Sequence, residues 1–317
     1  MSLPKISIVM PVFDCEATIG RALESIVAQD YPALELILMD GGSRDRTLAV
    51  AETFKDRFSH FVSEPDRGQT HALNKGFRLA SGDIFGWLCG DDAYQPGALK
   101  HVADLFTANP DANMAIGTSR RRYDNGDEQV LPLRPDLLER IGFHNGIDQP
   151  SAFWSADLHR AAGELDESME IGMDWDWWCR LKAAGAKAVL TDRELSYYHF
   201  PEGSKTSTDP AGNVAAMYRV IKAYGPLGGR LADIYLHLYR DFDLKGCYDS
   251  PPSAPKLLQL RWAATLLWLY ARYGRDLIAA YNWTWCARQA RGLPWHEPRA
   301  HLDARAFLTN LLRPSRS

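Results

Sequence analysis

The sequence predicts an α/β fold built on a parallel sheet, with a helical extension towards the C-terminal end. Strand-like apolar runs alternate with helix-like segments over the first 120 of 317 residues, acidic residues follow several of these runs, and the pattern from Val214 onward is helical. Alternating strands and helices form parallel sheets with right-handed crossovers. We therefore expect one domain at residues 1–213, with halves at 1–120 and 121–213, and an extension at 214–317.

Strand and helix signals follow each other in a regular order. Thr18 is a candidate N-cap for the first helix, and Pro96 suits the first turn of another. The expected strands are Ile6–Phe13, Leu34–Met39, Phe58–Ser63, Ile84–Leu88, Ser151–Ser155 and Lys187–Thr191. The expected helices follow Thr18 and Pro96 and cover Thr47–Phe54, Thr70–Ala80 and Met173–Ala184. Residues 121–150 are expected to be rich in loops.

Length and composition exclude several classes of protein. Apolar residues make up 46% of the chain, enough for a sizeable core. No segment has the pattern of a signal peptide, and no apolar stretch reaches the roughly 18 residues that suggest a membrane span. The five cysteines include no C-x-x-C pair, so neither a disulfide framework nor a zinc site is indicated, and a reducing cytoplasm is the expected compartment.

The net charge of −4 hides a basic C-terminal segment. Residues 254–317 carry ten Lys or Arg and three acidic residues, a net charge of +7, together with five of the ten tryptophans. Basic and aromatic residues together suit the surface of an anionic bilayer, which would place the protein at the inner face of the membrane. Packing on the main domain or an oligomer contact is the alternative. Nucleic acid is not an expected partner, because the rest of the chain is acidic.

Four acidic residues follow the ends of expected strands. Asp40 follows the second strand, Asp66 the third, and Asp91 and Asp92 the fourth. In open parallel sheets, ligands bind outside the carboxyl ends of the strands. The sequence therefore predicts a ligand site at this edge of the sheet.

Six motifs, in order along residues 5–205, resemble the family 2 glycosyltransferases. They are Pro-Val-Phe at 11–13, Asp-Gly-Gly-Ser-Arg-Asp at 40–45, Asn-Lys-Gly at 74–76, Ala-Ser-Gly-Asp at 80–83, Gly-Asp-Asp at 90–92 and Asp-Trp-Asp-Trp-Trp-Cys-Arg-Leu at 174–181. The resemblance implies a Rossmann-like type A glycosyltransferase domain with a nucleotide-binding first half and an acceptor-binding second half. It implies an inverting hexosyltransferase of polysaccharide or envelope glycan synthesis. The donor would be a nucleotide sugar, UDP-linked by family expectation, and the acceptor a saccharide or a lipid-linked saccharide.

A divalent cation is expected beside the fourth strand. Mg²⁺ and Mn²⁺ prefer carboxylate and phosphate oxygens, and an ion there would offset the charge of a diphosphate leaving group. Asp91 and Asp92 are the expected ligands, and Asp91 is also an expected nucleotide contact. The family's commoner motif has an acid where this chain has Cys89. The resemblance adds His199 as a metal or diphosphate contact, and leaves open whether Arg193 or Lys205 neutralises phosphate.

The resemblance also assigns nucleoside contacts. It implies that Asp40 accepts a hydrogen bond from the base ring, with Pro11 and Phe13 flanking the base and Glu16 and Asp66 nearby. The family often has a second acid after Asp40, where this chain has glycine. An Asx turn is the structural alternative for Asp40.

An inverting transfer needs a general base that takes the proton of the acceptor hydroxyl. The resemblance implies that Asp174 is this base. Asp176 should point to another side of the helix, because it lies two residues later. The tryptophans at 175, 177 and 178 are expected to raise the pKa of the carboxyl by desolvation or to offer a face to the sugar. Expected acceptor contacts are Gln149, Trp175 and Asp176.

Three other functions compete with this interpretation. A glycoside hydrolase also uses two carboxylates, but adjacent Asp91 and Asp92 suit it poorly and Asp40 would have no role. A sugar nucleotidyltransferase shares the fold type but needs a glycine-rich loop that is missing after the first strand. A non-catalytic module that binds nucleotide sugars is the third alternative.

Overall fold

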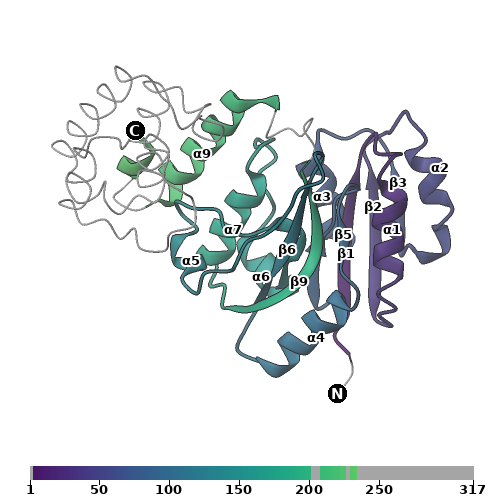
Figure 1. Ribbon diagram of the computed structural model, residues 1–317, viewed down its shortest axis with the longest axis horizontal. Coiled ribbons are helices and arrows are strands. Elements are labelled where there is room, and N and C mark those ends of the chain that lie inside the picture. Colours follow the sequence, from purple (N-terminus) through teal and green to yellow (C-terminus); the bar gives the residue numbers. More distant parts are fainter. Residues whose placement is uncertain (1–2, 201–207, 226–228, 234–317) are drawn as a thin grey trace, which may run out of the picture. The chain divides into compact units, whose positions relative to one another are not determined.

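The computed structural model describes residues 3–200, 208–225 and 229–233 (Figure 1). The chain forms two compact units: residues 1–141 with 145–209, and residues 142–144 with 210–317. The first unit contains the sheet and all of the predicted site residues. Its boundary falls after Asp209, and the predicted domain boundary lies at residue 213.

One mixed sheet runs through the first unit. Its strand order is β3-β2-β1-β4-β8-β6-β9-β5, with β7 paired to β6. Strands β1 to β4 are parallel, whereas β8 is antiparallel to both β4 and β6. The strands are β1 (Ile6–Val12), β2 (Leu34–Asp40), β3 (His60–Ser63), β4 (Ile84–Trp87), β5 (Ala93–Tyr94), β6 (Met114–Tyr123), β7 (Glu128–Val130), β8 (Ala152–Ser155) and β9 (Ala188–Phe200).

Helices cover both faces of the sheet. The core on one face joins alternate residues of β1, such as Ile6 and Ile8, to apolar residues of α1 and α4. On the other face, α3 and α7 pack through Phe77 and Trp178 against Phe85 and Trp87 of β4. The helices are α1 (Ile19–Val27), α2 (Thr47–Glu52), η1 (Lys55–Arg57), α3 (Gln69–Leu79), α4 (Ala98–Ala108), α5 (Leu137–Arg140), η2 (Gln149–Ser151), α6 (Ala156–Ala162) and α7 (Met173–Ala183).

The structure confirms the predicted alternation up to residue 108 and corrects the prediction for two later segments. Residues 121–150 are not simply loops, because β6 extends to Tyr123 and forms a hairpin with β7. The strand predicted at 187–191 continues to Phe200 and pairs in parallel with β6. Thr18 does precede α1, but its side chain makes no capping hydrogen bond.

The Ala-Ser-Gly-Asp motif at 80–83 lies at the amino edge of the sheet, opposite the predicted ligand site. The buried Glu35 carboxylate accepts hydrogen bonds from the backbone and hydroxyl of Ser81, each at 2.7 Å, and from Lys5 Nζ at 2.6 Å. These donors lower the pKa of Glu35 to about 2. Gly82 packs so closely that a Cβ there would lie 2.5 Å from Ser7 Oγ. The motif therefore has a structural role.

The Asn-Lys-Gly motif at 74–76 fixes α3 on the sheet. A Cβ on Gly76 would overlap Cγ1 of Val9 and lie 3.1 Å from Cγ of Met39, so the helix backbone rests directly on β1 and β2. Beside it, Lys75 Nζ lies 2.6 Å from a Glu64 carboxylate oxygen. The helix has no room to slide on the sheet.

Tryptophans dominate the core beneath α7. Trp87 stacks on Trp178 with ring centroids 5.6 Å apart, and Trp154 contacts both Trp177 and Trp178 edge to face. Trp177 and Trp178 are fully buried. The expectation that they offer a face to a sugar is therefore wrong, because core packing covers both rings.

The second unit is described over α9 (Pro210–Tyr224), residues 229–233 and the short segment 142–144. Within it, Lys222 Nζ lies 3.0 Å from the Asp233 carboxylate, which also accepts a hydrogen bond from the Tyr218 hydroxyl at 3.1 Å. Across the described ranges 3–200, 208–225 and 229–233, no helix is long and apolar enough to span a bilayer.

The close contact of Gly76 yields a stability prediction. We expect Gly76→Ala to lower the free energy of unfolding by about 1–3 kcal/mol, because the added methyl group must displace Val9 or Met39 in a packed core. Gly20→Ala is the matched control in α1, where a Cβ would meet Val50 at an ordinary 3.6 Å. Urea unfolding measures both variants. Equal stability of Gly76→Ala and the parent would contradict the tight packing of α3.

Candidate functional site

Two loops line the carboxyl edge of the sheet and are held together by hydrogen bonds. One follows β1 and the other follows β2. The Asp14 carboxylate accepts from the Arg44 backbone N–H at 2.7 Å, and the Glu16 carboxylate accepts from that of Arg46 at 2.7 Å. Pro11 is buried in β1, whereas Phe13 is 54% exposed at the start of its loop. Phe13 thus presents an open aromatic face at this edge, as a base-stacking residue would require.

Asp40 ends β2 with its carboxylate buried and saturated. Its two oxygens accept hydrogen bonds from the backbone N–H groups of Gly42 and Ser43 and from the hydroxyls of Ser43 and Ser63. This is the Asx-turn arrangement considered as the alternative. Direct recognition of a base by Asp40 stays a prediction, and it would require displacing one of these internal donors.

Asp66 occupies the space above Gly41. A Cβ on Gly41 would lie 2.6 Å from Oδ2 of Asp66. Oδ1 of Asp66 accepts the Gly68 backbone N–H at 2.7 Å, which ties the carboxylate to the first turn of α3. The carboxylate therefore lies where a second acid after Asp40 would place its side chain. Sequence reasoning alone gave no reason to connect Gly41 with Asp66.

Three potential metal ligands converge after β4. The thiol sulfur of Cys89 and one carboxylate oxygen each of Asp91 and Asp92 all lie within 4.8 Å of one another. Asp92 is buried, and its Oδ1 accepts the His199 backbone N–H at 2.9 Å. The guanidinium of Arg21 donates to the Asp91 carbonyl oxygen at 2.7 Å and holds the loop. The two carboxylates thus meet where the sequence predicts a metal.

Burial is costly for these two acids. Desolvation raises the pKa of Asp91, and desolvation together with the neighbouring Asp91 charge raises the pKa of Asp92 well above its usual range. A divalent cation would remove this cost, because carboxylate oxygens are the ligands that Mn²⁺ and Mg²⁺ prefer. The donor set therefore fits such an ion. The pKa of the Cys89 thiol is also raised by burial, and the sulfur accepts the Gln69 amide at 3.1 Å.

His199 lies at this site but is not in the group of converging ligands. Its ring Nε2 lies 3.0 Å from an Asp124 carboxylate oxygen, and its buried Nδ1 has no hydrogen-bond partner within the described residues. Its backbone N–H supports Asp92. This geometry gives His199 a supporting position, and metal ligation by its ring stays a prediction.

Asp174 lies in the first turn of α7, half-buried. Desolvation raises the pKa of its carboxyl against the opposing effect of backbone N–H groups and of Asn145, whose amide lies 3.3 Å from Oδ2. The predicted direction of the shift is therefore confirmed. Trp175 is half-buried, and its indole N–H donates to the Ile141 carbonyl oxygen. A contact of this ring with an acceptor stays a prediction.

The other expected acceptor contacts are largely buried. Gln149 donates from its amide to the Trp87 carbonyl oxygen at 2.8 Å, and its Oε1 lies 3.6 Å from the Cys89 sulfur. Asp176 is buried and lies 3.9 Å from Arg180. Gln149 thus lies beside the converging ligands through Cys89. Contact of Gln149 or Asp176 with an acceptor stays a prediction.

Sequence reasoning missed a buried ion pair beside the site. Arg121 holds Asp148 through three hydrogen bonds, the shortest at 2.6 Å, and its guanidinium lies 5.4 Å from the ring centre of Phe200. Burial raises the pKa of Tyr198 well above its usual range, and the charges of Asp174, Asp92 and Asp148 raise it further. The only sequence signal was the position of Asp148 immediately before Gln149.

Arg193 and Lys205 are the two candidates for neutralising the charge of a phosphate, and the structure describes only Arg193. Arg193 donates to the Pro96 carbonyl oxygen at 2.9 Å. It lines a surface hollow of about 580 Å³ with Arg120, Glu128 and Tyr197. Lys205 lies outside the described residues, as does the basic segment 254–317.

Comparison with known proteins identifies the kind of domain. The profile of glycosyl transferase family 2 matches residues 7–159. An uncharacterized glycosyltransferase of Rickettsia typhi is 26% identical over 201 residues, which cover 61% of this chain and 62% of that protein. The chain spans about three fifths of the length of this relative and of its counterpart from Rickettsia prowazekii.

Solved structures share the fold. Residues 1–349 of S. aureus TarS, in complex with UDP-GlcNAc, align with a TM-score of 0.58 at 16% identity, over 92% of this chain and 93% of that one. The mannosyltransferase PcManGT of Pyrobaculum calidifontis, in complex with GDP-Man and Mn²⁺, aligns with a TM-score of 0.54 at 17% identity, over 90% and 86%. The likeness confirms the type A glycosyltransferase fold that the sequence predicts.

The raised pKa values yield a prediction about pH and metal. The ordinary pKa of an aspartate is 3.8, and the pKa values of Asp91 and Asp92 are raised in the folded protein. Below pH 3.8 this difference stabilises the fold, and the stabilisation is lost as the pH rises through the raised pKa values. We therefore expect Mn²⁺ to raise the melting temperature, and the increase to grow as the pH rises above the ordinary range of a carboxyl, because binding needs the charged carboxylates.

Thermal melts of the parent and of Asp92→Asn, with Mn²⁺ or EDTA, measure this effect. The variant should lose most of the Mn²⁺-dependent increase. An equal increase in parent and variant at every pH would contradict a metal site at Asp91 and Asp92.

Proposed function

Because the profile of glycosyl transferase family 2 matches residues 7–159, we propose that the chain transfers a sugar, with inversion at the anomeric carbon, from a nucleotide-diphosphate donor to a saccharide or lipid-linked saccharide. One observation carries the proposal. The carboxylates of the loop acids Asp91 and Asp92 converge with the Cys89 thiol after β4, and the charge of the helix acid Asp174 acts on the same thiol, whose pKa burial raises most. A donor whose diphosphate lies at Asp91 and Asp92 would therefore be near Asp174, the proposed general base.

The nucleoside end of the donor is proposed to bind at the loops after β1, β2 and β3. Phe13 is exposed there and suits stacking on a base. The Gly68 backbone N–H holds Oδ1 of Asp66, which leaves Oδ2 as the oxygen that can accept from a ligand. We assign the base or ribose contact to Asp66, with Asp40 shaping the loop and Pro11 and Glu16 flanking it.

The diphosphate is proposed to lie beside Asp91 and Asp92. A bound Mn²⁺ or Mg²⁺ would stabilise the negative charge that grows on the leaving nucleotide. Two hydrogen bonds hold this loop in place: Arg21 donates to the Asp91 carbonyl oxygen, and the His199 backbone N–H donates to the Asp92 carboxylate. PcManGT in complex with GDP-Man and Mn²⁺ supports a metal in this fold.

Asp174 is the proposed general base. A carboxyl with a raised pKa is a stronger proton acceptor than an exposed one, and it still ionises near neutral pH when the shift is moderate. Asn145 donates to the carboxylate and fixes its orientation. Asp174 would take the proton of the acceptor hydroxyl as this oxygen bonds to the anomeric carbon and the nucleotide diphosphate leaves from the opposite face.

The proposal also includes a class of donor and a cellular location. TarS in complex with UDP-GlcNAc supports a UDP-sugar as donor, and PcManGT in complex with GDP-Man supports the wider class of nucleotide sugars. We propose a role in polysaccharide or envelope glycan synthesis in the cytoplasm, with peripheral binding to the inner membrane face through residues 254–317.

The base assignment gives a mutational prediction. We expect Asp174→Asn to lower the transfer rate by about 100-fold or more, since general base catalysis contributes that much, while nucleotide affinity stays within about two-fold of the parent. Asp157→Asn is the control, because this carboxylate lies on α6 with an 89% exposed side chain. Steady-state transfer assays and calorimetry measure the two quantities.

The stereochemistry of the product tests the same assignment. NMR of the product should find the anomeric configuration opposite to that of the donor. Retention would reject the inverting mechanism, and parental activity in Asp174→Asn would make this residue structural.

Membrane binding by residues 254–317 gives a separate prediction. The net charge of +7 should make the full-length protein co-sediment with vesicles that contain anionic phospholipid, and salt should release it by screening. Neutral vesicles are the control. If the protein ignores anionic vesicles at low salt, the segment packs on the protein or forms an oligomer contact.

A further inference from the structure

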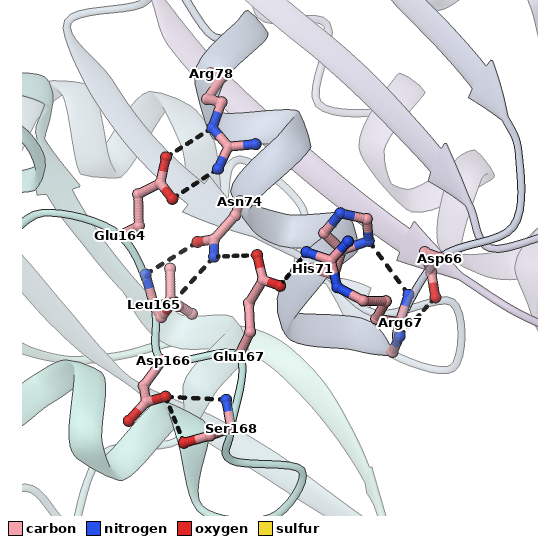
Figure 2. A network of polar contacts seen from close by, with 11 residues as sticks. Asp66, Arg67, His71, Asn74, Arg78, Glu164, Leu165, Asp166, Glu167 and Ser168 are labelled. Carbon is pink, nitrogen blue, oxygen red and sulfur yellow. Dashed lines mark hydrogen bonds and ion pairs between the residues drawn. The ribbon is translucent and has the colours of Figure 1, made fainter.

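Helix α3 is joined by side chains to the segment at 163–172, which connects α6 to α7 (Figure 2). Residues at positions 70, 74 and 78 lie on one face of α3, because they are four apart. Each of them bonds to this segment. At the outer end, Arg78 makes two hydrogen bonds of 2.6 Å to the Glu164 carboxylate. Near the start of the helix, the Arg67 guanidinium lies 2.5 Å from Glu167.

The Asn74 side-chain amide bonds to both backbone polar groups of Leu165, in the segment at 163–172. Its amide oxygen accepts the Leu165 backbone N–H at 2.9 Å, and its amide nitrogen donates to the Leu165 carbonyl oxygen at 3.0 Å. The same nitrogen lies 3.2 Å from the Glu167 carboxylate. Asn74 is buried, so these bonds are shielded from water and losing them would leave polar groups unpaired.

Thr70 contacts Met173, the residue immediately before the proposed base Asp174. Its buried hydroxyl lies 3.2 Å from the Met169 carbonyl oxygen and 2.7 Å from Sδ of Met173. Met173 is the first residue of α7, and Asp174 follows it. The position of the Asp174 backbone is thus tied to the first turn of α3.

The start of α3 also carries the proposed donor contact. Asp66 bonds to the Gly68 backbone N–H, and Gly68 immediately precedes the helix. Gly76 brings α3 directly against β1 and β2, so the helix that carries both contacts is packed on the sheet. One rigid helix therefore contacts both the nucleoside turn and the start of α7.

We propose that Thr70, on a helix that Asn74 anchors to the segment at 163–172, is a positioning residue that sets the spacing between the bound donor and the Asp174 carboxylate. The inference rests on the proposed function, since it assumes that Asp174 is the base. Transfer is sensitive to this spacing, because a base must lie within hydrogen-bond reach of the acceptor hydroxyl while that oxygen meets the anomeric carbon. A purely structural role would instead affect stability and leave turnover intact.

The test compares kcat, nucleotide affinity and melting temperature in the full-length protein. Thr70→Val removes the hydroxyl at nearly constant volume, and Met173→Leu removes the sulfur on the other side. We expect each to lower kcat about 10-fold while the nucleotide Kd changes less than about two-fold, since a misplaced base costs turnover and not donor binding. Thr70→Ser should restore most of kcat, because it keeps the hydroxyl.

The double variant Thr70→Val/Met173→Leu should be about as slow as Thr70→Val alone, because Thr70→Val already removes the contact with Met173 together with that to the Met169 carbonyl oxygen. Arg78→Met is the matched control on the same helix face. Its ion pair is about half exposed, with 54% and 52% of the two side chains accessible, so kcat should stay within about two-fold of the parent.

The outcomes separate this inference from the proposed function. If Asp174→Asn abolishes transfer but Thr70→Val and Met173→Leu keep the parental kcat, the positioning role is wrong and the base assignment stands. If Asp174→Asn retains transfer, the base assignment itself fails. Additive losses in the double variant, or equal losses of kcat and nucleotide affinity, would also overturn the positioning role.

Discussion

Carboxylates are buried at the carboxyl edge of the sheet, and the loops around this edge are arranged about them. The chain meets the cost of burial in different ways. Asp40 is saturated by internal donors from two loops. Asp92 receives one backbone N–H and has a raised pKa instead. An acid with few hydrogen-bond donors is one that a cation can bind, so the number of donors distinguishes Asp40, which shapes its loop, from the acids proposed to bind the metal.

Close backbone packing supports this edge from behind. Gly76 brings α3 onto β1 and β2, and Gly41 leaves room for the Asp66 carboxylate over the turn after β2. Neither position tolerates a side chain without displacing a neighbour. Packing and internal hydrogen bonds therefore explain the motifs at 74–76 and 80–83. The motifs at 90–92 and 174–181 instead contain carboxyl groups whose pKa values are raised by burial.

The sequence was sufficient for the first four strands and for α7, because buried parallel strands and a first-turn acid leave clear local signals. It was insufficient for β6, whose second half carries Arg120, Arg121 and Arg122 and resembles a loop by polarity. Local pattern also could not reveal that Asp148 meets Arg121 across 27 residues, or that Trp177 and Trp178 point into the core. These features depend on which segments the fold brings together.

We propose that the acids at the carboxyl edge of the sheet form one metal-dependent site for a nucleotide diphosphate. Calorimetric titration of the full-length protein with UDP, dTDP and GDP, in Mn²⁺ and in EDTA, measures whether they do. We expect that at least one of the three nucleotides binds in Mn²⁺ and that EDTA abolishes or greatly weakens this binding. Absence of binding by all three in Mn²⁺, or binding that is equally strong in EDTA, would contradict the claim.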